Sequence, residues 1–357
     1  MAKPDEAGVL IVEDSLVTQR FLVELIAQAE GLRVVGVARD GQEALELARA
    51  LKPDVISMDI AMPKMGGLEA TRLIMRDSPT PIVVVSGSLN TQDVDMAFEA
   101  LQAGAVAVVE KPPGPQHPDF DRKRQEMLTA LRLMARAEAV RQRRLAVDVA
   151  VAAQVAPQVA PPEARPTPPR RPLVEVVALC ASAGGPAALA RVLGGLPRDF
   201  PVPVLVVQHL ATDFLPGLAR WLDQETPLTV RLARAGDALR SGVVYVAPGG
   251  AHMALNGKGR VRLIAERGEH RHQPSATVLL ESVAQHYGKA AIGVIMTGMG
   301  DDGARGLLAL RKAGAHTLAQ DEASCVVFGM PAAAIQCGAA ERVVPLNRMA
   351  AAIQDLL

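Results

Sequence analysis

Near its start the chain reads Gly8-Val9-Leu10-Ile11-Val12-Glu13-Asp14, an apolar run that ends in two carboxylates. A short, continuous apolar run of this kind is typical of a strand buried on both faces of a parallel sheet. Ser15 follows it and can cap a helix, and the pattern of apolar run and helical segment then repeats. The first part of the chain is therefore predicted to be an α/β domain.

Five such strand and helix units fit into residues 1–116, which is the length of a small flavodoxin-like (βα)5 domain. The carboxyl ends of these strands form one edge of the sheet, where ligands bind in open parallel sheets. The predicted strands are Gly8–Val12, Arg33–Ala38, Asp54–Met58, Pro81–Ser86 and Ala105–Val109.

The composition of the 357 residues suits a globular protein of two domains, with 49% hydrophobic and 21% charged residues. Lys plus Arg and Asp plus Glu both total 38, so a dominant electrostatic role on nucleic acid or on an anionic membrane is disfavoured. No apolar run reaches the ~18 residues that span a bilayer, and no signal-peptide core is present. The three cysteines form no CxxC pair, and we expect a cytoplasmic protein.

Residues 117–172 are expected to be a linker. A basic helical pattern runs from Asp119 to Val149, and an Ala/Pro-rich tract follows as far as Pro172. Such a tract cannot bury a core and should be extended and semi-rigid. The arginines of the helical part fit a solvated face better than a nucleic-acid contact.

Apolar runs resume at Leu173 and continue to the end, so residues 173–357 are predicted to be a second, doubly wound α/β domain with a parallel sheet. A β-hairpin is predicted within His252–Ile264, turned at Asn256-Gly257. The other predicted elements are strands Val174–Cys180, Val202–Val207, Gly242–Ala247 and Ala291–Met296, and helices Pro186–Leu193, Leu215–Asp223 and Ala304–Lys312.

Three carboxylates are expected to converge at the ligand-binding edge of the first domain. Glu13 and Asp14 follow the first strand and Asp59 follows the third. Such clustered negative charge needs a hard cation, and Mg²⁺ prefers oxygen ligands. Ser86 ends the fourth strand and Lys111 follows the fifth, so a hydroxyl and an ammonium should face the same site. These five residues predict phosphoryl transfer to Asp59, with Mg²⁺ screening the phosphate and with Lys111 and Ser86 receiving its oxygens.

The first domain resembles the receiver domain of two-component response regulators. The resemblance rests on residues 9–15, on Met58-Asp59-Ile60-Ala61-Met62-Pro63-Lys64-Met65-Gly66-Gly67-Leu68 and on Val109-Glu110-Lys111-Pro112. It implies phosphorylation of Asp59 by a partner histidine kinase. Two positions depart from the usual pattern: Glu13 replaces the commoner Asp, and Val108 stands where many receivers carry a switch aromatic.

In the second domain, three strand ends carry residues with nucleophile, base and acid chemistry. Ser182 lies in the small-residue turn Ala181-Ser182-Ala183-Gly184-Gly185, His209 follows a buried strand, and Asp301 and Asp302 lie in a Gly-rich loop. A serine needs a base within hydrogen-bond reach and a third group that holds the tautomer of that base. Ser182, His209 and one of the two aspartates are therefore predicted to form a catalytic triad.

The order Ser, His, Asp differs from the Ser, Asp, His order of an ordinary α/β-hydrolase. Residues 174–357 instead resemble the catalytic domain of the chemotaxis protein-glutamate methylesterases, which also deamidate glutamines. The resemblance includes Val244-Tyr245-Val246-Ala247-Pro248-Gly249 and Val327-Phe328-Gly329-Met330-Pro331. It implies Ser182 as nucleophile, His209 as base, Asp302 as orienting acid, and backbone groups near Ala183 and Met299 as oxyanion donors.

The resemblance also implies a methylated chemoreceptor as protein substrate, at the membrane surface but not within it, and no cofactor for the ester chemistry. Ala183 stands where Thr is usual and Cys180 where Gly is usual. Loss of a hydroxyl beside the nucleophile leaves a rival interpretation open, in which the second domain is a degenerate, non-catalytic binding module. Two further hypotheses are a hydrolase of small esters and a DNA-binding regulator, although no basic helix-turn-helix follows the linker.

Overall fold

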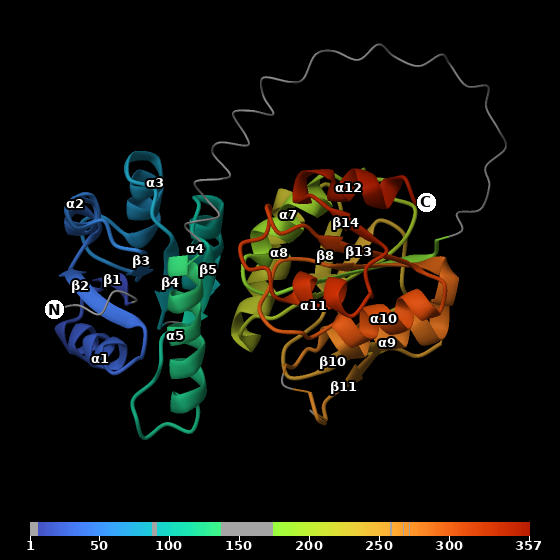
Figure 1. The fold of residues 1–357 in the computed structure, drawn as a ribbon, viewed down its shortest axis with the longest axis horizontal. Coiled ribbons are helices and arrows are strands. Elements are labelled where there is room, and N and C mark those ends of the chain that lie inside the picture. The colour runs from blue at the N-terminus through green and yellow to red at the C-terminus, as the bar shows by residue number, and fades with distance from the viewer. Residues whose placement is uncertain (1–5, 88–90, 137–173, 258, 267, 271) are drawn as a thin grey trace, which may run out of the picture.

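The computed structural model describes residues 6–87, 91–136, 174–257, 259–266, 268–270 and 272–357. These residues form two α/β domains, each built on its own parallel sheet (Figure 1). Part of the predicted linker, residues 120–136, instead forms helix α5, and its apolar side chains, Met127 and Leu131 among them, are buried against the N-terminal sheet. The fifth helix of the first domain therefore lies beyond residue 116. The remainder of the predicted basic helix and the Ala/Pro-rich tract lie outside the described residues. None of the helices in the described part of the chain is long and apolar enough to cross a membrane.

The N-terminal sheet has the strand order β2-β1-β3-β4-β5, with every pairing parallel. This is the order of flavodoxin-like domains, as predicted. Helices α1 and α5 pack on one face, and α2, α3 and α4 pack on the other. The bounds are β1 Ala7–Val12, α1 Leu16–Ala27, β2 Leu32–Ala38, α2 Gly41–Leu51, β3 Val55–Met58, α3 Gly67–Asp77, β4 Ile82–Ser86, α4 Thr91–Gln102, β5 Ala107–Glu110 and α5 Phe120–Arg136.

The continuous apolar sequence of β1 follows from burial on both sides of the sheet. Val9 and Ile11 pack with α1 and α5, whereas Leu10 and Val12 pack against the helices of the opposite face. Each of these four side chains is at most 1% exposed. The strand ends where Ser15 caps α1, its side chain accepting a hydrogen bond from the backbone of Thr18. Glu13 and Asp14 are thereby held at the carboxyl edge of the sheet.

The C-terminal sheet has seven parallel strands in the order β14-β13-β12-β6-β7-β9-β8. Helices α9, α10 and α11 pack on one face, and α7, α8 and α12 on the other. The bounds are β6 Val176–Ala181, α7 Gly185–Gly194, β7 Val204–Gln208, η1 Thr212–Phe214, α8 Leu215–Glu225, β8 Thr229–Leu232, β9 Val243–Val246, β10 His252–Leu255, β11 Val261–Ile264, α9 Ala276–Tyr287, η2 Gly288–Ala290, β12 Ala291–Ile295, α10 Ala304–Lys312, β13 His316–Gln320, α11 Met330–Gln336, β14 Arg342–Val344 and α12 Leu346–Gln354.

Strands β10 and β11 form the predicted antiparallel hairpin, but its turn is longer than a two-residue Asn-Gly turn. Leu255 pairs with Val261, so residues 256–260 connect the strands. The backbone N–H of Asn256 donates to the carbonyl of Arg260 across this connection, over 2.9 Å. Gly257 and Gly259 both have positive φ angles, of 66° and 84°. The second glycine lets the chain continue its turn before pairing resumes.

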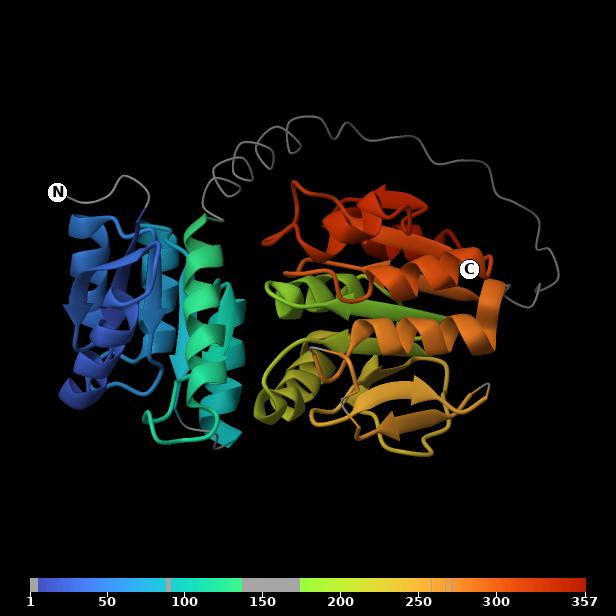
Figure 2. The same ribbon diagram turned by 60° about the horizontal axis from the view of Figure 1, so that its bottom comes forward.

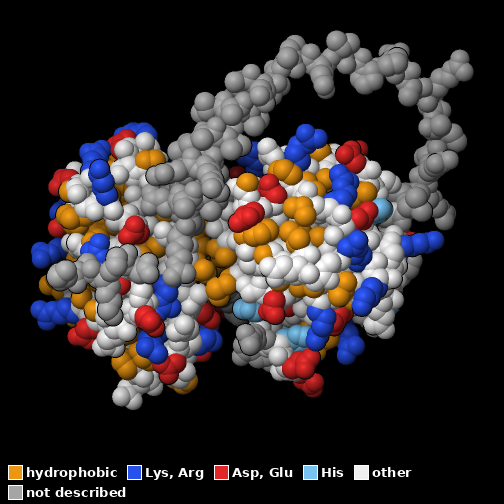
Figure 3. Space-filling model, in the orientation of Figure 1, with side chains coloured by type: hydrophobic (Ala, Val, Ile, Leu, Met, Phe, Trp, Pro, Cys, Tyr) orange, Lys and Arg blue, Asp and Glu red, His pale blue; other side chains and the backbone are white. Residues whose placement is uncertain are grey.

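The two domains touch along helices α4 and α8. Phe98 of α4 stacks on Trp221 of α8, with ring centroids 5.7 Å apart, and Asp95 pairs with Arg220 over 2.7 Å. Gly217 allows this approach, because a Cβ there would overlap the side chain of Val94. Figures 1 and 2 also show α5 on the side of the N-terminal domain that faces the second domain. Hydrophobic side chains gather where the two lobes meet in Figure 3.

Candidate active site and phosphorylation site

Ser182 lies in a tight turn between β6 and α7. Its backbone N–H donates to the carbonyl of Thr297 over 3.0 Å, and its carbonyl accepts from the backbone of Gly185 over 2.8 Å. The amide nitrogen of Gln208 donates to the same carbonyl over 2.7 Å. A side chain at 185 would overlap the Gln208 amide, so only glycine fits. The turn therefore fixes the backbone of Ser182 against two neighbouring strands.

Thr297, two residues after the end of β12, supports the turn that carries Ser182. Its hydroxyl donates to the carbonyl of Ala183 over 2.9 Å. The same oxygen accepts from the backbone N–H groups of Val326 and Val327, over 3.1 and 3.0 Å. Thr297 is only 1% exposed, so these bonds are shielded from water. One hydroxyl thus connects the turn that carries Ser182 to the loop before α11.

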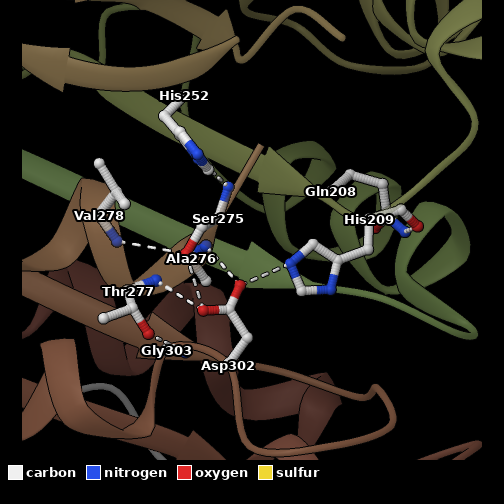
Figure 4. Close-up of polar contacts among 9 residues, drawn as sticks. All are labelled: Gln208, His209, His252, Ser275, Ala276, Thr277, Val278, Asp302 and Gly303. Atoms are coloured by element: carbon white, nitrogen blue, oxygen red, sulfur yellow. Dashed lines mark hydrogen bonds and ion pairs between the residues drawn. The ribbon is translucent and has the colours of Figure 1, made fainter. Parts of the chain in front are cut away.

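The structure brings His209 and Asp302 into direct contact. The Nε2 of His209 lies 2.8 Å from Oδ2 of Asp302 (Figure 4). His209 follows β7 and Asp302 lies in the loop before α10, so the two come from different strand ends. The predicted preference for Asp302 over Asp301 agrees with this contact.

Asp302 is also bound to the start of α9. Its Oδ1 accepts from the hydroxyl of Ser275 over 2.9 Å and from the backbone of Thr277 over 3.1 Å. Its Oδ2 accepts from the backbone of Ala276 over 2.7 Å. The positive end of the helix dipole favours negative charge at this position. The four donors around Asp302 converge on it in Figure 4.

These contacts keep Asp302 ionised. Burial of the carboxyl raises its pKa, but the hydrogen bond and charge of His209, with the bonds from Thr277 and Ala276, outweigh burial and hold the pKa well below its usual range. An ionised carboxylate only accepts hydrogen bonds, so Nε2 of His209 must carry the proton. In the neutral ring, Nδ1 is then the basic nitrogen. Nδ1 is buried and has no hydrogen-bond partner among the described residues.

Ser182, His209 and Met299 line one cavity of about 420 Å³. Residues of β5 and α5 from the N-terminal domain line its opposite side, among them Val108, Arg122, Leu133 and Met134. Within the described part of the chain, the Ser182 hydroxyl makes no hydrogen bond to the His209 ring. The hydrogen bond between a nucleophile and its general base is often long in a free enzyme and shortens when substrate binds. The structure thus joins His209 and Asp302 directly and places Ser182 on the same cavity.

The two backbone groups suggested as oxyanion donors lie beside this cavity. Ala183 and Met299 both line it, and Met299 is 42% exposed. Cys180, the residue two positions before Ser182, is instead fully buried in β6. Burial raises the pKa of its thiol well above the ordinary value. Cys180 is therefore a packing residue of the sheet.

In the N-terminal domain, Glu13, Asp14 and Asp59 form the predicted acidic cluster. One carboxylate oxygen from each lies within 4.8 Å of the others. Lys111 joins the cluster, with Nζ 2.6 Å from Glu13 and 2.8 Å from Asp59. The backbone N–H of Lys111 donates to the carbonyl of Ser86 over 2.8 Å. All five predicted residues therefore lie at the carboxyl edge of the sheet.

The ionisable groups in this cluster shift one another's pKa values. Burial raises the pKa of Glu13 above its ordinary value, despite the opposing effect of Lys111. Burial lowers the pKa of Lys111, but the charges and hydrogen bonds of Asp59 and Glu13 outweigh it and raise that pKa. A further cation would relieve the crowding of three carboxylates around one ammonium. The all-oxygen donor set fits Mg²⁺.

Two supporting residues, Gln208 and Thr297, were given no role from the sequence. Gln208 precedes the predicted base, and Thr297 opens the loop that contains Asp302. Their position beside strand ends was a visible signal, but their partners are backbone groups far away in the sequence. Ser275 caps α9, and its second contact, with Asp302, depends on how α9 packs.

Comparison with known proteins gives a family match for each part of the chain. Residues 177–353 match the CheB methylesterase family and residues 9–117 match the response regulator receiver domain. A relative from Myxococcus xanthus, named protein-glutamate methylesterase/protein-glutamine glutaminase 4, is 47% identical over 98% of this chain and 96% of its own. The chain belongs to the CheB methylesterase family. It combines that family's catalytic domain with an N-terminal receiver domain.

Other members of the family match at similar length. The relative named protein-glutamate methylesterase/protein-glutamine glutaminase 4 in Geobacter metallireducens is 42% identical, with 98% of both chains covered. Among solved structures, the CheB methylesterase catalytic domain of Thermotoga maritima is 35% identical, with a TM-score of 0.50. The match covers 52% of this chain and 99% of that one. The family resemblance and the fold predicted from the sequence are both confirmed.

Proposed function

We propose that the protein is a phosphorylation-activated protein-glutamate O-methylesterase that acts on methyl-accepting chemotaxis receptors. One arrangement carries the proposal: Nδ1 of His209 has no hydrogen-bond partner within the described ranges, its Nε2 is held by an ionised Asp302, and the ring lines the same cavity as Ser182. That combination is what a serine nucleophile requires. The names of the relatives supply the substrate class.

The chemistry begins at the γ-methyl ester of a receptor glutamate. Ser182 Oγ attacks the ester carbonyl while Nδ1 of His209 takes its proton. The new Oγ–C bond forms a tetrahedral intermediate, and Asp302 stabilises the imidazolium that results. The bond to the methoxy group then breaks, and His209 returns the proton so that methanol leaves.

Water completes the cycle. It attacks the acyl carbon while His209 accepts its proton. The Oγ–C bond then breaks as His209 returns that proton to Oγ, which restores Ser182 and releases the free glutamate. In both tetrahedral intermediates the oxyanion needs two fixed donors. The backbone N–H groups of Ala183 and Met299 are the proposed donors, because both residues line the cavity beside Ser182.

The receiver domain supplies the control. We assign Asp59 as the phosphorylated residue, with a histidine kinase as phosphodonor, and Glu13, Asp14 and Asp59 as the residues that would hold Mg²⁺. The bound ion would screen the negative charge of the incoming phosphate. Lys111, already bonded to Asp59, and Ser86 then receive phosphate oxygens.

The receiver also limits access to the ester site in the resting protein. Its α5 and β5 residues line the cavity that contains Ser182 and His209, so a receptor segment and the receiver compete for the same space. Phosphorylation of Asp59 is proposed to loosen the α4–α8 contact and open the cavity. This opening does not depend on an aromatic switch, because Val108 occupies the position where many receivers carry a switch aromatic.

Methanol release from methylated receptor membranes tests the function. We expect release by the wild-type protein, faster with Mg²⁺ and a small phosphodonor, and none by Ser182→Ala. Asp59→Asn should keep only the basal rate. Binding of receptor with no methanol release under phosphorylating conditions would instead support the non-catalytic binding module.

Deamidation of receptor glutamines is a second activity, supported by the glutaminase part of the relatives' names. The same acyl-enzyme would form, with ammonia in place of methanol as leaving group. Ammonia release from a glutamine-bearing receptor should also vanish in Ser182→Ala. Turnover of small esters without turnover of receptor would point to a general esterase.

A further inference from the structure

A second histidine covers the proposed base. The rings of His209 and His272 are stacked, with centroids 4.2 Å apart and planes inclined by only 12°. The side chain of His209 is 7% exposed, whereas His272 lies on the surface. The exposed ring therefore shields one face of the buried ring from water.

His272 belongs to a short segment that also holds the acid. Three residues later, Ser275 donates its hydroxyl to Asp302, and the backbones of Ala276 and Thr277 donate to the same carboxylate. The start of this segment is tied to the hairpin, because the side chain of Gln273 donates to the carbonyl of Ala265 over 2.8 Å. Ser275 is tied to it as well, through the ring of His252. Residues 272–277 thus contact both members of the His209–Asp302 pair.

The His209 ring needs such a contact. One in-plane hydrogen bond to Asp302 fixes the direction of Nε2, but it does not stop the ring from tilting about that bond. Nδ1 has no partner among the described residues to oppose the tilt. A parallel ring against one face opposes it directly, and it also excludes water, which strengthens the interaction between His209 and the Asp302 carboxylate.

We propose that His272 is a positioning residue: its ring stacks on His209 and keeps Nδ1 aimed at the serine nucleophile. This proposal rests on the proposed function for its kinetic consequence, but the ring orientation itself is independent of substrate. Stacking depends on the flat face of the His272 ring. An aromatic ring without nitrogen atoms should therefore replace it.

The experiment compares three variants of the full-length protein. His272→Ala removes the ring, His272→Phe keeps a ring at the exposed site, and His270→Ala removes a histidine of the same loop that packs edge-on against His252 instead. With Mg²⁺ and phosphodonor, we expect kcat for methanol release to fall about 2- to 10-fold in His272→Ala, the range set by an aromatic pair. KM should stay unchanged, and His272→Phe should recover most of the loss. His270→Ala should match the wild type.

The second measurement does not depend on turnover. The Nε2–H proton of His209, hydrogen-bonded to Asp302, should give a slowly exchanging downfield proton resonance, assigned by its loss in Asp302→Asn. We expect it to persist in His272→Phe and His270→Ala and to broaden in His272→Ala.

Two results would overturn the proposal. The first is a resonance that stays equally sharp in His272→Ala, together with an unchanged kcat. The second is a rise in KM alone, which would make His272 a substrate contact. If the wild type releases no methanol, the proposed function fails, and the resonance by itself decides the positioning role.

Discussion

Asp302 shows how single residues determine this site. It accepts four hydrogen bonds while largely buried, and three of them come from the first residues of α9 and its cap. Those donors hold the carboxylate still, so the direction of the Nε2–H of His209 is fixed before substrate arrives. Preorganisation of this kind lowers the reorganisation needed during the reaction.

Asp302→Asn should therefore cause a large loss of kcat and only a small loss of unfolding free energy. An amide can present its NH2 group to His209, which would favour the wrong tautomer of the ring. We expect kcat for methanol release to fall on the order of 10³- to 10⁴-fold, while KM changes little. A near-normal kcat would show that another residue orients His209.

The same substitution has a predictable pH dependence. The pKa of Asp302 is lower in the folded protein than in the unfolded chain, so its ionised form stabilises the fold. That contribution is fully present above the unfolded pKa of about 3.9 and is lost as the pH falls below it towards the folded value. Urea unfolding should show wild type more stable than Asp302→Asn at neutral pH, with a gap that narrows below about pH 4. A gap that widens in acid would contradict the assigned shift.

Thr297→Val tests the support of the turn that carries Ser182, the proposed nucleophile. Valine has a similar shape, but it leaves the backbone N–H groups of Val326 and Val327 without their acceptor. We expect a loss of about 1–3 kcal/mol in unfolding free energy and a lower kcat. Thr297→Ser keeps the hydroxyl and is the matched control, with kcat close to that of the wild type. Equal kcat values in the two variants would show that the Thr297 hydroxyl does not support Ser182.

At the scale of elements, the proposed active site depends on adjacent parallel strands. β12, β6 and β7 are neighbours in the sheet, so the turns that follow them meet at one edge. The close approach of two of these turns requires glycine at 298, where a Cβ would lie 2.7 Å from the Cβ of Ser182. The turns pack against each other through backbone, with little room for side chains.

Gly298→Ala should consequently displace Ser182. The nearest obstacle, the sulfur of Met330, sits on a flexible side chain and can move, but the turn of Ser182 cannot. We expect a reduced rate of methanol release and a reduced rate of Ser182 labelling by a fluorophosphonate, with phosphorylation of Asp59 unaffected. Gly194→Ala, at the exposed end of α7, controls for glycine loss alone, because the nearest atom to an added methyl group there would lie 3.9 Å away. Normal labelling of Gly298→Ala would mean that the two turns can separate without cost.

At the scale of the whole molecule, side chains of α4 in the receiver contact side chains of α8 in the catalytic domain. This α4–α8 contact combines the Phe98–Trp221 stack with the Asp95–Arg220 pair. Trp221 is the single tryptophan of the chain and is 8% exposed. Its fluorescence should therefore report when the two domains move apart.

Gly217→Ala should weaken this contact without unfolding α8. Alanine favours a helix by about 1 kcal/mol over glycine, but its methyl group would overlap Val94 of the receiver. We expect higher methanol release without phosphodonor, a smaller increase on phosphorylation, and a red shift of Trp221 emission. Gln224→Ala, on an exposed position of α8, is the control. A lower basal rate in Gly217→Ala would contradict the inhibitory role of the contact.

Much of the fold follows from local patterns. The five strands of the receiver and the strands that precede Ser182, His209 and the Asp302 loop are continuous apolar runs, so their positions were predicted to within a few residues. Strands β8, β13 and β14 were not predicted. β8 and β14 lie at the edges of the sheet, where burial of one strand face is incomplete and the apolar signal is weak. The longer turn of the hairpin was missed because Asn256-Gly257 also fits a two-residue turn.

The sequence by itself determined the two α/β domains, the acidic edge of the receiver, and the serine, histidine and aspartate at three strand ends. Each of these is encoded over a few neighbouring residues, through apolar periodicity and the residue types that follow a strand. The tertiary structure alone decided that Ser275 and the start of α9 bind Asp302, that Thr297 supports the Ser182 turn, that His272 covers His209, and that α4 meets α8. Those contacts join residues far apart in the chain, and packing geometry, which no local pattern contains, brings them together.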